Sequence, residues 1–309
     1  GKGFVGGALQ NVLIELETAF YKNSISSYNC CQLQEWSVGD RKNCGASFQL
    51  EVLKMMKQRF MTLRCRFHSI ASLDLPVAFY MARSEMLVSL LYCVTLSGVA
   101  FLPLDAEFSV NVVSYRLKDS SSCICLQDRP LVGIWWKSAI PGTFLEPRCE
   151  KSVLCSGSQK AYMFYTSGST GNPKGVMIGQ RNVSNVVHWM GTSPFPVAQE
   201  DKFLFQISIS FDVLIEVLSL PLLSMCGLVI VPLKKEREVL FLNSVLTQVD
   251  VVDMTPSLAM QISLLSFKRL KLVILTGEIL SSSFAEDMKK LVPFVWNEYG
   301  PTETTFSVI

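Results

Sequence analysis

A run of small hydroxyl residues and glycines that ends in a lysine carries the clearest chemistry in this 309-residue chain. Residues 162–176 read YMFYTSGSTGNPKGV, and the apolar segment Tyr162–Tyr165 predicts a strand. The loop after it offers backbone N–H groups, hydroxyls and a cation, which together suit a polyphosphate because glycines let the backbone approach an anion closely. We expect a phosphate-binding loop made of Thr166, Ser167, Gly168, Ser169, Thr170, Gly171 and Lys174.

The spacing of this loop differs from that of the common P-loop. Five residues after Gly168 stands Pro173, where the pattern G-x-x-x-x-G-K-[ST] requires glycine. The loop therefore indicates phosphate binding of another class.

Two further polar segments could do chemistry. Residues 208–212 read SISFD, and a buried Asp212 is costly unless something positive meets it. Asp212 could instead cap the helix that follows, since aspartate is a good N-cap residue. Residues 297–304 read NEYGPTET, which by itself could be a proline turn with a solvated Glu303.

Taken together, five segments in this order resemble the motifs of the adenylate-forming superfamily. The superfamily contains acyl-CoA synthetases, luciferases and the adenylation domains of nonribosomal peptide synthetases. The SISFD and NEYGPTET segments are most similar to those of amino-acid adenylation domains. The segments are LSGVAFLPLD (96–105), TSGSTGNPKGV (166–176), SISFD (208–212), TGE (276–278) and NEYGPTET (297–304).

The resemblance implies a reaction between a carboxylate and the α-phosphorus of ATP, which forms an acyl-adenylate and releases pyrophosphate. The protein then has to hold the reactants in line and neutralise developing charge. The Thr166–Thr170 loop and Lys174 would hold the β- and γ-phosphates, Thr302 would contact the α-phosphate, and Glu303 would ligate Mg²⁺. The implied catalytic residues are thus Thr166, Lys174, Thr302 and Glu303.

The resemblance also implies how the nucleoside is bound. Tyr299 would lie against the adenine ring, and Asn297 would recognise its exocyclic amine. Gly277 would let the backbone approach the nucleotide closely. Glu278 and Gly300 belong to the same nucleotide-binding turns.

In amino-acid-activating members, the aspartate of the SxSFD segment pairs with the substrate α-ammonium group, which implies that role for Asp212. Three other pocket positions are acidic, which favours a second cation and predicts a basic substrate such as lysine, ornithine, arginine or another diamino acid. One or more of these residues could instead face solvent, and the match around Glu216 could be shifted by one residue. The implied pocket residues are Asp212, Val213, Glu216, Asp253, Ile274, Thr276, Glu298 and Phe306.

The chain also departs from the family pattern. Gln180 stands where many members have histidine, and only Ala46–Leu50 in the first sixty residues resembles an early motif. The chain begins at Gly1 and ends at Ile309, directly after the Mg²⁺ motif. We therefore expect a fragment that lacks the small C-terminal domain, binds ATP weakly and turns over poorly. A downstream carrier domain with phosphopantetheine, in the same chain or another, is the implied partner of a full synthetase.

The elements that must position these residues follow an alternating order, which predicts an α/β fold of two packed lobes with largely parallel sheets. The resemblance implies the N-terminal, large-domain part of the acetyl-CoA synthetase-like fold. We expect one partial adenylation domain over 1–309, with a first lobe and connector at 1–157 and a second lobe with the phosphate loop at 158–309. Strands are predicted at 76–80, 99–102, 123–126, 202–206, 228–231 and 272–276, and helices at 48–60, 112–118, 182–190 and 284–291.

Composition excludes several other classes of protein. With 49% hydrophobic residues and a net charge of +2, the chain can bury a core but has no basic excess for nucleic acid. Its ten cysteines and two histidines show no zinc-ligand spacing. The uncharged runs 87–104 and 217–233 contain Gly98 and Gly227 and end in Pro-Leu, which favours buried helix–turn–strand units over membrane spans. No secretory signal opens the chain, so we expect a cytoplasmic protein.

Two other functions stay open. An acyl- or aryl-CoA ligase would keep the phosphate loop but bind a plain carboxylate, and it would have no need of Asp212. A catalytically inactive remnant is the alternative of a different class, and the missing C-terminal part supports it.

Overall fold

The computed structural model describes residues 34–35, 75–96, 98–122, 124–128, 159–167, 172–192 and 195–307. The expected helix at 48–60, the segment Ala46–Leu50 and loop residues 168–171 lie outside the described residues. The chain splits into two compact units, and the described residues 75–183 belong to the first, whereas 34–35 and 184–307 belong to the second. Each unit contains one sheet.

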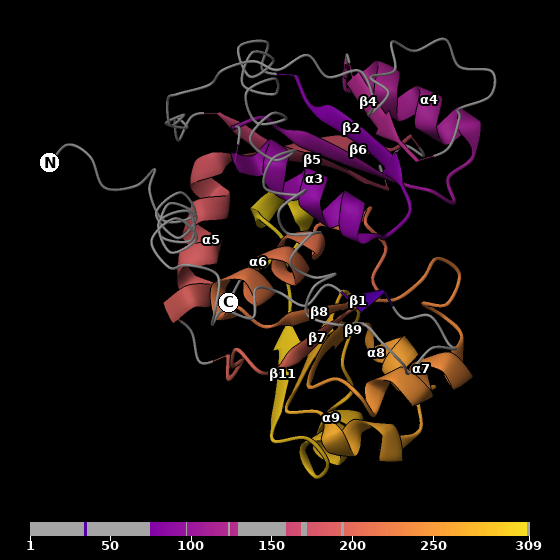
Figure 1. Ribbon diagram of the computed structural model, residues 1–309, viewed down its shortest axis with the longest axis vertical. Helices are drawn as coiled ribbons and strands as arrows, with labels where there is room; N and C mark the ends of the chain where they lie inside the picture. Colours follow the sequence, from indigo (N-terminus) through magenta and orange to yellow (C-terminus); the bar gives the residue numbers. More distant parts are fainter. Residues whose placement is uncertain are drawn as a thin grey trace, which may run out of the picture. The chain divides into compact units, whose positions relative to one another are not determined.

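The first unit is built on a five-stranded sheet of order β4-β2-β3-β5-β6. The pairs β2–β3, β2–β4 and β3–β5 are parallel, and only β5–β6 is antiparallel. Two helices, α3 (Glu85–Leu96) and α4 (Val110–Asp119), lie on opposite faces of this sheet (Figure 1). The strands are β2 (Val77–Met81), β3 (Phe101–Asp105), β4 (Ile124–Gln127), β5 (Lys160–Thr166) and β6 (Lys174–Gly179).

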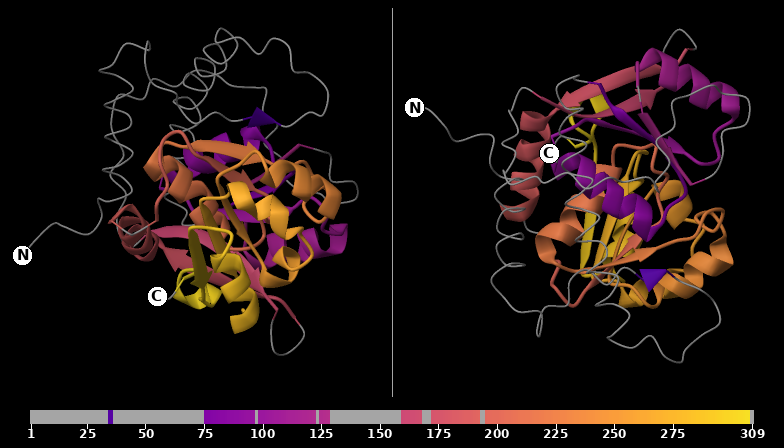
Figure 2. Two further views of the ribbon diagram at one scale, coloured as in Figure 1. Left: turned by 90° about the horizontal axis from the view of Figure 1, so that it is seen from below. Right: turned by 45° about the horizontal axis from the view of Figure 1, so that its top comes forward.

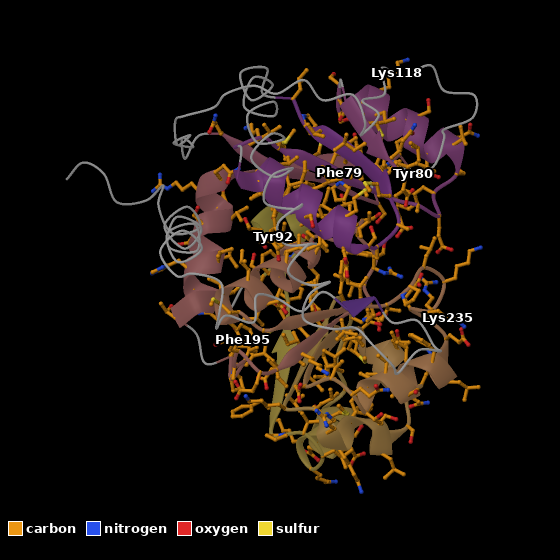
Figure 3. All side chains as sticks on the ribbon, viewed as in Figure 1. Phe79, Tyr80, Tyr92, Lys118, Phe195 and Lys235 are labelled. Atoms are coloured by element: carbon orange, nitrogen blue, oxygen red, sulfur yellow. The ribbon has the colours of Figure 1, made fainter. Side chains whose placement is uncertain are left out.

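Strand β2 explains why these segments read as continuous apolar runs. All five of its side chains are buried, including Phe79 and Tyr80 (Figure 3). Ala78 and Tyr80 belong to a core cluster with Val113 and Leu117 of α4. A parallel strand that is covered on both faces has no polar side to alternate with.

The second unit is built on a six-stranded sheet of order β1-β8-β7-β9-β10-β11, in which every pair is parallel. The register aligns Ile274 with Asp253 and with Trp296, and it aligns Thr276 with Glu298. The strands are β1 (Gln34–Glu35), β7 (Lys202–Phe205), β8 (Gly227–Ile230), β9 (Val251–Met254), β10 (Leu272–Thr276) and β11 (Phe294–Glu298).

Helices cover both faces of the second sheet. The helices α7 (Val239–Leu246), α8 (Pro256–Ala259) and α9 (Ser282–Lys289) bury apolar side chains in one core cluster with Val252, Val273 and Leu275 of the strands. Helix α6 (Leu214–Ser224) lies on the other face (Figure 2). The 3₁₀ helices η1 (Leu264–Arg269) and η2 (Thr302–Thr304) follow β9 and β11 in sequence.

The α/β architecture with largely parallel sheets is confirmed, and the chain forms two compact units. The division falls between Val183 and Ser184, inside α5 (Gln180–Thr192), whereas the expected lobe boundary was 157/158. The reason is strand pairing. β5 joins β3 at Phe101–Tyr162, and β6 returns antiparallel to β5, so the strands around the phosphate loop belong to the first sheet.

The two expected helix–glycine–strand units form, with one difference. After α3 the chain turns at Gly98, whose φ is +71°, and continues into β3. After α6 the left-handed residue is Met225, with φ +55°, and Gly227 is the first residue of β8. Among the described residues, no helix is long and apolar enough to cross a membrane.

Candidate active site

Four predicted pocket residues come together at the carboxyl ends of parallel strands in the second unit. Asp253 lies near the end of β9, Thr276 ends β10 and Glu298 ends β11. Successive side chains of a strand point to opposite faces, so Asp253, Ile274, Thr276 and Glu298 share the face opposite the Val252–Val273–Leu275 core. Ligands of open parallel sheets bind at this edge of the strands.

Glu216 joins this group from α6, which precedes β9 in the sequence with β8 and α7 between them. One carboxylate oxygen from each of Glu216, Asp253 and Glu298 lies within 4.8 Å of the other two. The exposed fractions of these residues are 1%, 1% and 3%. The prediction placed all three in one pocket, and the structure brings them together.

Most oxygens of these carboxylates have no partner among the described residues. Both oxygens of Glu216, both oxygens of Glu298 and Oδ2 of Asp253 are buried without a hydrogen bond. Oδ1 of Asp253 accepts a hydrogen bond from the Thr276 hydroxyl at 2.5 Å. Buried carboxylates are normally paired or hydrogen-bonded, so this group is an exception among the described residues and a candidate for binding a cationic group.

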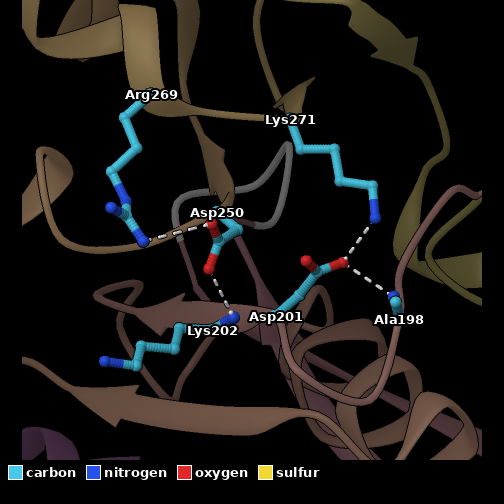
Figure 4. Close-up of polar contacts among 6 residues, drawn as sticks. All are labelled: Ala198, Asp201, Lys202, Asp250, Arg269 and Lys271. Carbon is cyan, nitrogen blue, oxygen red and sulfur yellow. Dashed lines mark hydrogen bonds and ion pairs between the residues drawn. The ribbon is translucent and has the colours of Figure 1, made fainter.

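The acidic residues at the opposite ends of the strands show the usual arrangement. Asp201, just before β7, accepts hydrogen bonds from the Lys271 ammonium at 2.9 Å and from the Ala198 N–H at 2.7 Å (Figure 4). Asp250, just before β9, accepts from the Lys202 N–H at 2.9 Å and lies 3.6 Å from the Arg269 guanidinium (Figure 4). Among the described residues, the acidic side chains of this sheet therefore form ion pairs with lysine or arginine at one edge and form none at the other.

Electrostatics follow from this burial. Burial raises the pKa of Glu216 well above its ordinary value, and the charges of Glu298 and Asp253 raise it further. Burial also raises the pKa of Asp253 to about 8, although the Thr276 hydroxyl opposes this change. Glu216 and Asp253 therefore retain protons at neutral pH, because carboxylates crowded in an apolar site cannot all ionise.

Asp212, directly before α6, lies close to the same group. Burial raises the pKa of its carboxyl, while hydrogen bonds from the Thr302 hydroxyl and from the N–H groups of Asp212 and Val213 oppose the rise, and the charge of Glu298 adds to it. Its Oδ2 is buried and unpartnered. The N-cap residue of α6 is Val213, and no side chain caps this helix, so the capping alternative for Asp212 is not what the structure shows.

The remaining predicted pocket residues are buried or half-buried. Ile274 is fully buried on β10, Val213 is half-buried, and Phe306 is 1% exposed. Thr305 and Phe306 both adopt left-handed backbone conformations, with φ values of +70° and +54°. Such conformations are costly for residues other than glycine and cluster at functional sites.

The predicted nucleotide-binding residues of the second unit lie on the loops after β10 and β11. Gly277 has φ +82°, a conformation that favours glycine. Glu278 accepts hydrogen bonds from the N–H and hydroxyl of Ser257, at 2.9 and 2.8 Å. Asn297 and Tyr299 are exposed. An added Cβ at Gly300 would lie 2.2 Å from the Phe306 carbonyl oxygen, so only glycine fits there.

Glu303, the predicted metal ligand, is exposed at the surface of η2. Within the described part of the chain, no hydrogen bond or ion pair engages its carboxylate. Its oxygens are therefore free to bind a hard cation such as Mg²⁺.

The phosphate loop belongs to the first unit, and the structure describes its two ends. Thr166 ends β5 and is paired in register with Lys174, which begins β6. Ser167 and Lys174 are exposed, whereas Gly168, Ser169, Thr170 and Gly171 lie outside the described residues. The hydroxyl of Tyr115 on α4 donates to the carbonyl of Pro173 at 3.0 Å and supports the end of the loop.

Sequence reasoning missed two residues near the acidic group. Gln206, which is 4% exposed, donates from its amide to the carbonyl oxygen of Asp253 at 2.8 Å. Trp296 lies on the pocket face of β11 in a cluster with Trp189 and Phe195, with ring centroids 6.4 and 5.2 Å away. A polar residue just after a buried strand was the only signal for Gln206.

Comparison with known proteins agrees with this arrangement. The family described as AMP-binding enzyme matches residues 72–309. The chain is 32% identical over 245 residues to a dimodular nonribosomal peptide synthase of Bacillus subtilis (strain 168), a match that covers 74% of this chain. It is 31% identical over 250 residues to bacitracin synthase 3 of Bacillus licheniformis, covering 75% of this chain. The chain spans 10% of the length of the first relative and 4% of the length of the second.

Solved structures show the same fold. The N-terminal subdomain of Klebsiella oxytoca NpsA, in complex with anthranilyl-AMSN, matches with a TM-score of 0.64 and 20% identity, over 78% of this chain and 66% of that one. The nonribosomal peptide synthetase FmoA3 in its AMPPNP-bound form also matches with a TM-score of 0.64 and 20% identity, over 80% of this chain and 29% of that one. The match of the family model over 72–309 shows that the chain belongs to the family of AMP-binding enzymes, and its relatives make it an adenylate-forming domain of the kind found in nonribosomal peptide synthetases.

Proposed function

We propose that the chain activates an amino acid as its acyl-adenylate. The observation that carries this proposal is the buried Asp212 carboxylate, whose Oδ2 has no partner although Asp201 and Asp250 of the same unit are paired with cations. A ligand ammonium group would compensate the cost of burying that charge. A substrate with only a carboxylate would leave Asp212 uncompensated.

In the reaction, a carboxylate oxygen of the amino acid attacks the α-phosphorus of ATP. The bond from that phosphorus to the bridging oxygen breaks, and pyrophosphate leaves with the electron pair. Asp212 would orient the amino acid through its α-ammonium, and the Thr302 hydroxyl, which donates to Asp212, would turn to the α-phosphate. Most of the catalysis would come from this positioning and from charge neutralisation.

The other residues would bind the nucleotide and the metal. Lys174, with Thr166 and the loop that follows it, would bind the β- and γ-phosphates. The exposed Tyr299 offers a ring face for the adenine, and the exposed Asn297 offers an amide for its exocyclic amine. Glu303 would hold Mg²⁺, which supplies positive charge to the phosphates.

The product of such a step is a reactive mixed anhydride, which needs a nucleophile to accept the acyl group. By analogy with the relatives, we propose the thiol of phosphopantetheine on a carrier domain. The complete protein would then be a synthetase or a related enzyme.

We further propose a basic amino acid as the substrate, because Glu216, Asp253 and Glu298 bring three more buried carboxylates to the pocket. No lysine, arginine or histidine of the described residues forms an ion pair with any of them. A cationic side chain of the substrate would supply the missing charge.

Two other functions would use part of this site. An acyl- or aryl-CoA ligase would use the nucleotide residues but would leave four acidic residues in its substrate pocket without purpose. A catalytically inactive chain would keep the fold and lose exchange activity.

The test is ATP–pyrophosphate exchange, measured on the natural full-length protein with single amino acids. We expect exchange with a basic amino acid, and Asp212→Asn should lower kcat/KM about 100-fold or more, because truncating one partner of a buried charge pair is strongly unfavourable. Asp287→Asn on α9 is the matched control, since that carboxylate is exposed and pairs with Lys290 on the same helix end. A folded, ATP-binding protein that gives no exchange with any amino acid would contradict the proposal.

A further inference from the structure

The first end of the phosphate loop is anchored to helix α4 through Tyr165. Its hydroxyl donates to Oδ2 of Asp119, the last residue of α4, at 2.7 Å and lies 3.2 Å from the carbonyl oxygen of Arg116. Burial, the hydrogen bond to Asp119 and the charge of that carboxylate all raise the pKa of Tyr165, so the hydroxyl keeps its proton and acts as the donor. Because Tyr165 directly precedes Thr166, this hydrogen bond restrains the strand end that carries Thr166.

The second end of the loop is anchored to the same helix through Tyr115. Its hydroxyl donates to the carbonyl oxygen of Pro173 at 3.0 Å, and Pro173 directly precedes Lys174. Lys174 is paired in register with Thr166 across β5 and β6. Tyr115 and Asp119 lie one turn apart in α4, a spacing that places two side chains on one face of a helix. One face of α4 therefore restrains both ends of the loop.

Ring contacts keep Tyr165 in this position. The Arg116 guanidinium lies 5.0 Å from the centre of the Tyr165 ring and 4.3 Å from the centre of the Phe108 ring. The rings of Tyr115 and Tyr165 meet edge to face, with centroids 6.4 Å apart. On β6, an added Cβ at Gly175 would lie 3.3 Å from the Tyr165 ring, so the bare backbone of glycine leaves room for that ring.

The buried side of α4 makes the helix a firm support. Val113 and Leu117 are fully buried and belong to one core cluster with Leu102 and Leu104 of β3. Tyr165 belongs to the same cluster. Because a close-packed core has little freedom to shift, α4 can fix the positions of the groups that it binds.

The exposure of the two helix residues indicates that their hydrogen bonds contribute more to geometry than to stability. Tyr115 is 39% exposed, so water can replace the Pro173 carbonyl as the partner of its hydroxyl. Asp119 is exposed as well, and water can solvate its carboxylate. The free energy of unfolding therefore depends little on either bond, whereas the positions of the loop ends depend on both.

We propose that Tyr115 and Asp119 are positioning residues for the β- and γ-phosphates of ATP. Each acts through the residue to which it is hydrogen-bonded, next to a loop residue that would bind phosphate. A displacement of about 1 Å at such a contact can cost up to about 100-fold in rate, so two restraints on one short loop have a direct effect on ATP. This inference rests on the role in phosphate binding proposed above for Thr166 and Lys174.

The first experiment measures nucleotide binding to the natural full-length protein by titration calorimetry, with ATP and AMP compared in excess Mg²⁺. The two nucleotides share the adenosine and the α-phosphate, so the ratio of their Kd values reports on the β- and γ-phosphates. We expect Tyr115→Phe to weaken ATP binding about 3- to 10-fold, the net contribution of one hydrogen bond, and to leave AMP binding unchanged. Its unfolding midpoint in urea should equal that of wild type.

Two substitutions test Asp119. Asp119→Asn keeps a side-chain oxygen that can accept from Tyr165, so it should bind ATP almost as tightly as wild type. Asp119→Ala removes the acceptor and should weaken ATP binding about 3- to 10-fold without changing AMP binding. A purely structural role would affect both nucleotides equally or neither of them.

Tyr80→Phe is the matched control from the same sheet. The Tyr80 hydroxyl is buried and lies 3.2 and 3.3 Å from the carbonyl oxygens of Ala106 and Phe108, so its bonds do not involve the loop. We expect this substitution to lower the unfolding midpoint and to leave the ratio of the ATP and AMP Kd values unchanged.

The outcomes separate this inference from the role of the loop itself. Lys174→Ala should remove most of the preference for ATP over AMP. If it does, but Tyr115→Phe and Asp119→Ala keep the wild-type ratio or weaken both nucleotides equally, positioning by α4 is wrong and the role of the loop stands. If Lys174→Ala leaves the ratio unchanged, the loop does not bind these phosphates and the inference fails with it. Pyrophosphate exchange by the wild-type protein tests amino-acid activation separately.

Discussion

At the scale of single residues, the acidic side chains of the second unit have two different environments. Asp201 is buried, yet it bonds to the Lys271 ammonium and a backbone N–H. Glu216 and Glu298 are also buried, but within the described part of the chain no donor is recorded for their carboxylate oxygens. Because a carboxylate without a partner destabilises the fold, its presence at a strand edge indicates binding rather than stability.

The hydroxyl of Thr276 donates a hydrogen bond to Asp253, one of the three buried carboxylates. In Thr276→Val the Asp253 oxygen loses its donor, so we expect the free energy of unfolding to fall by about 1–3 kcal/mol. Urea denaturation followed by tryptophan fluorescence measures this change. Thr247→Val is the control, because its hydroxyl bonds to the Ser244 carbonyl at an exposed position. Equal unfolding midpoints for wild type and Thr276→Val would contradict the role given to this bond.

Gly300 is required by close approach of the backbone. In Gly300→Ala the new Cβ would meet the Phe306 carbonyl at 2.2 Å, so residues 305–307 must move. We expect lower stability and loss of pyrophosphate exchange, because Thr302 and Glu303 lie within the displaced turn.

Two other glycines serve as controls for that substitution. Gly277→Ala has free space but a φ of +82°, and should cost about 1–2 kcal/mol of stability through backbone strain alone. Gly191→Ala in α5 has ordinary contacts of 3.6 Å and should be neutral or stabilise by up to about 1 kcal/mol. A Gly300→Ala protein as active as Gly191→Ala would contradict the close-approach argument.

At the scale of elements, the parallel strands of the second sheet have different tasks at their two ends. Before β7, β9 and β10, ion pairs and backbone hydrogen bonds tie Asp201, Asp250 and Lys271 together. At the carboxyl ends of β9, β10 and β11 lie Asp253, Glu298, Gly277 and the turn at Gly300. Because all strands are parallel, every carboxyl end lies at one edge, and the site is assembled from distant segments.

The Asp201–Lys271 pair joins β7 to β10 at the amino edge, and Asp201 is almost completely buried there. Lys271→Met leaves Asp201 with the Ala198 N–H alone, so we expect a loss of stability of about 1–2 kcal/mol, reduced by the partial exposure of the lysine. Denaturant unfolding checks this value. Lys290→Met removes a surface ion pair with a similar N–O distance and should not shift the unfolding midpoint. Equal effects of the two substitutions would mean that burial of Asp201 is unimportant.

At the scale of the whole molecule, the buried carboxylates Glu216 and Asp253 should make stability depend on pH. The pKa of Asp253 is raised from an ordinary value near 4 to about 8, and the pKa of Glu216 is also raised. Between these values the folded protein holds protons that the unfolded chain releases. The stabilisation is thus complete at acidic pH and is lost as pH rises toward 8, by about 1.4 kcal/mol per pH unit for each proton.

Asp253→Asn removes one of these titrating carboxyl groups. The free energy of unfolding should therefore fall less between pH 5 and pH 8 in this variant than in wild type. Comparison of the two profiles cancels the contribution of all other titrating groups. Urea midpoints at several pH values, in the absence of amino acids, measure the difference. Parallel profiles would show that Asp253 titrates at its ordinary pKa.

The sequence by itself determined the parts whose chemistry is local. The residues 166–176 and 297–304 carry the resemblance to AMP-binding enzymes, because spacing along the chain is enough to specify a loop. The strand 272–276 was predicted with the bounds that it has, since a short apolar run between polar residues reads as a buried strand. The sequence did not predict the left-handed residue after α6, because Met225 takes a conformation that glycine usually takes, and Gly227 stands two residues later.

Only the tertiary structure decided which residues meet. Glu216, Asp253 and Glu298 are separated by tens of residues, and the resemblance could name them as pocket positions without showing that their oxygens converge or lack partners. Pairing of β5 with β3 and of β6 with β5 likewise moved the unit boundary to 183/184, because strand partners are chosen by packing across the sheet. Local sequence specifies loops and short strands, whereas register and burial arise from contacts between distant segments, and those contacts create the site.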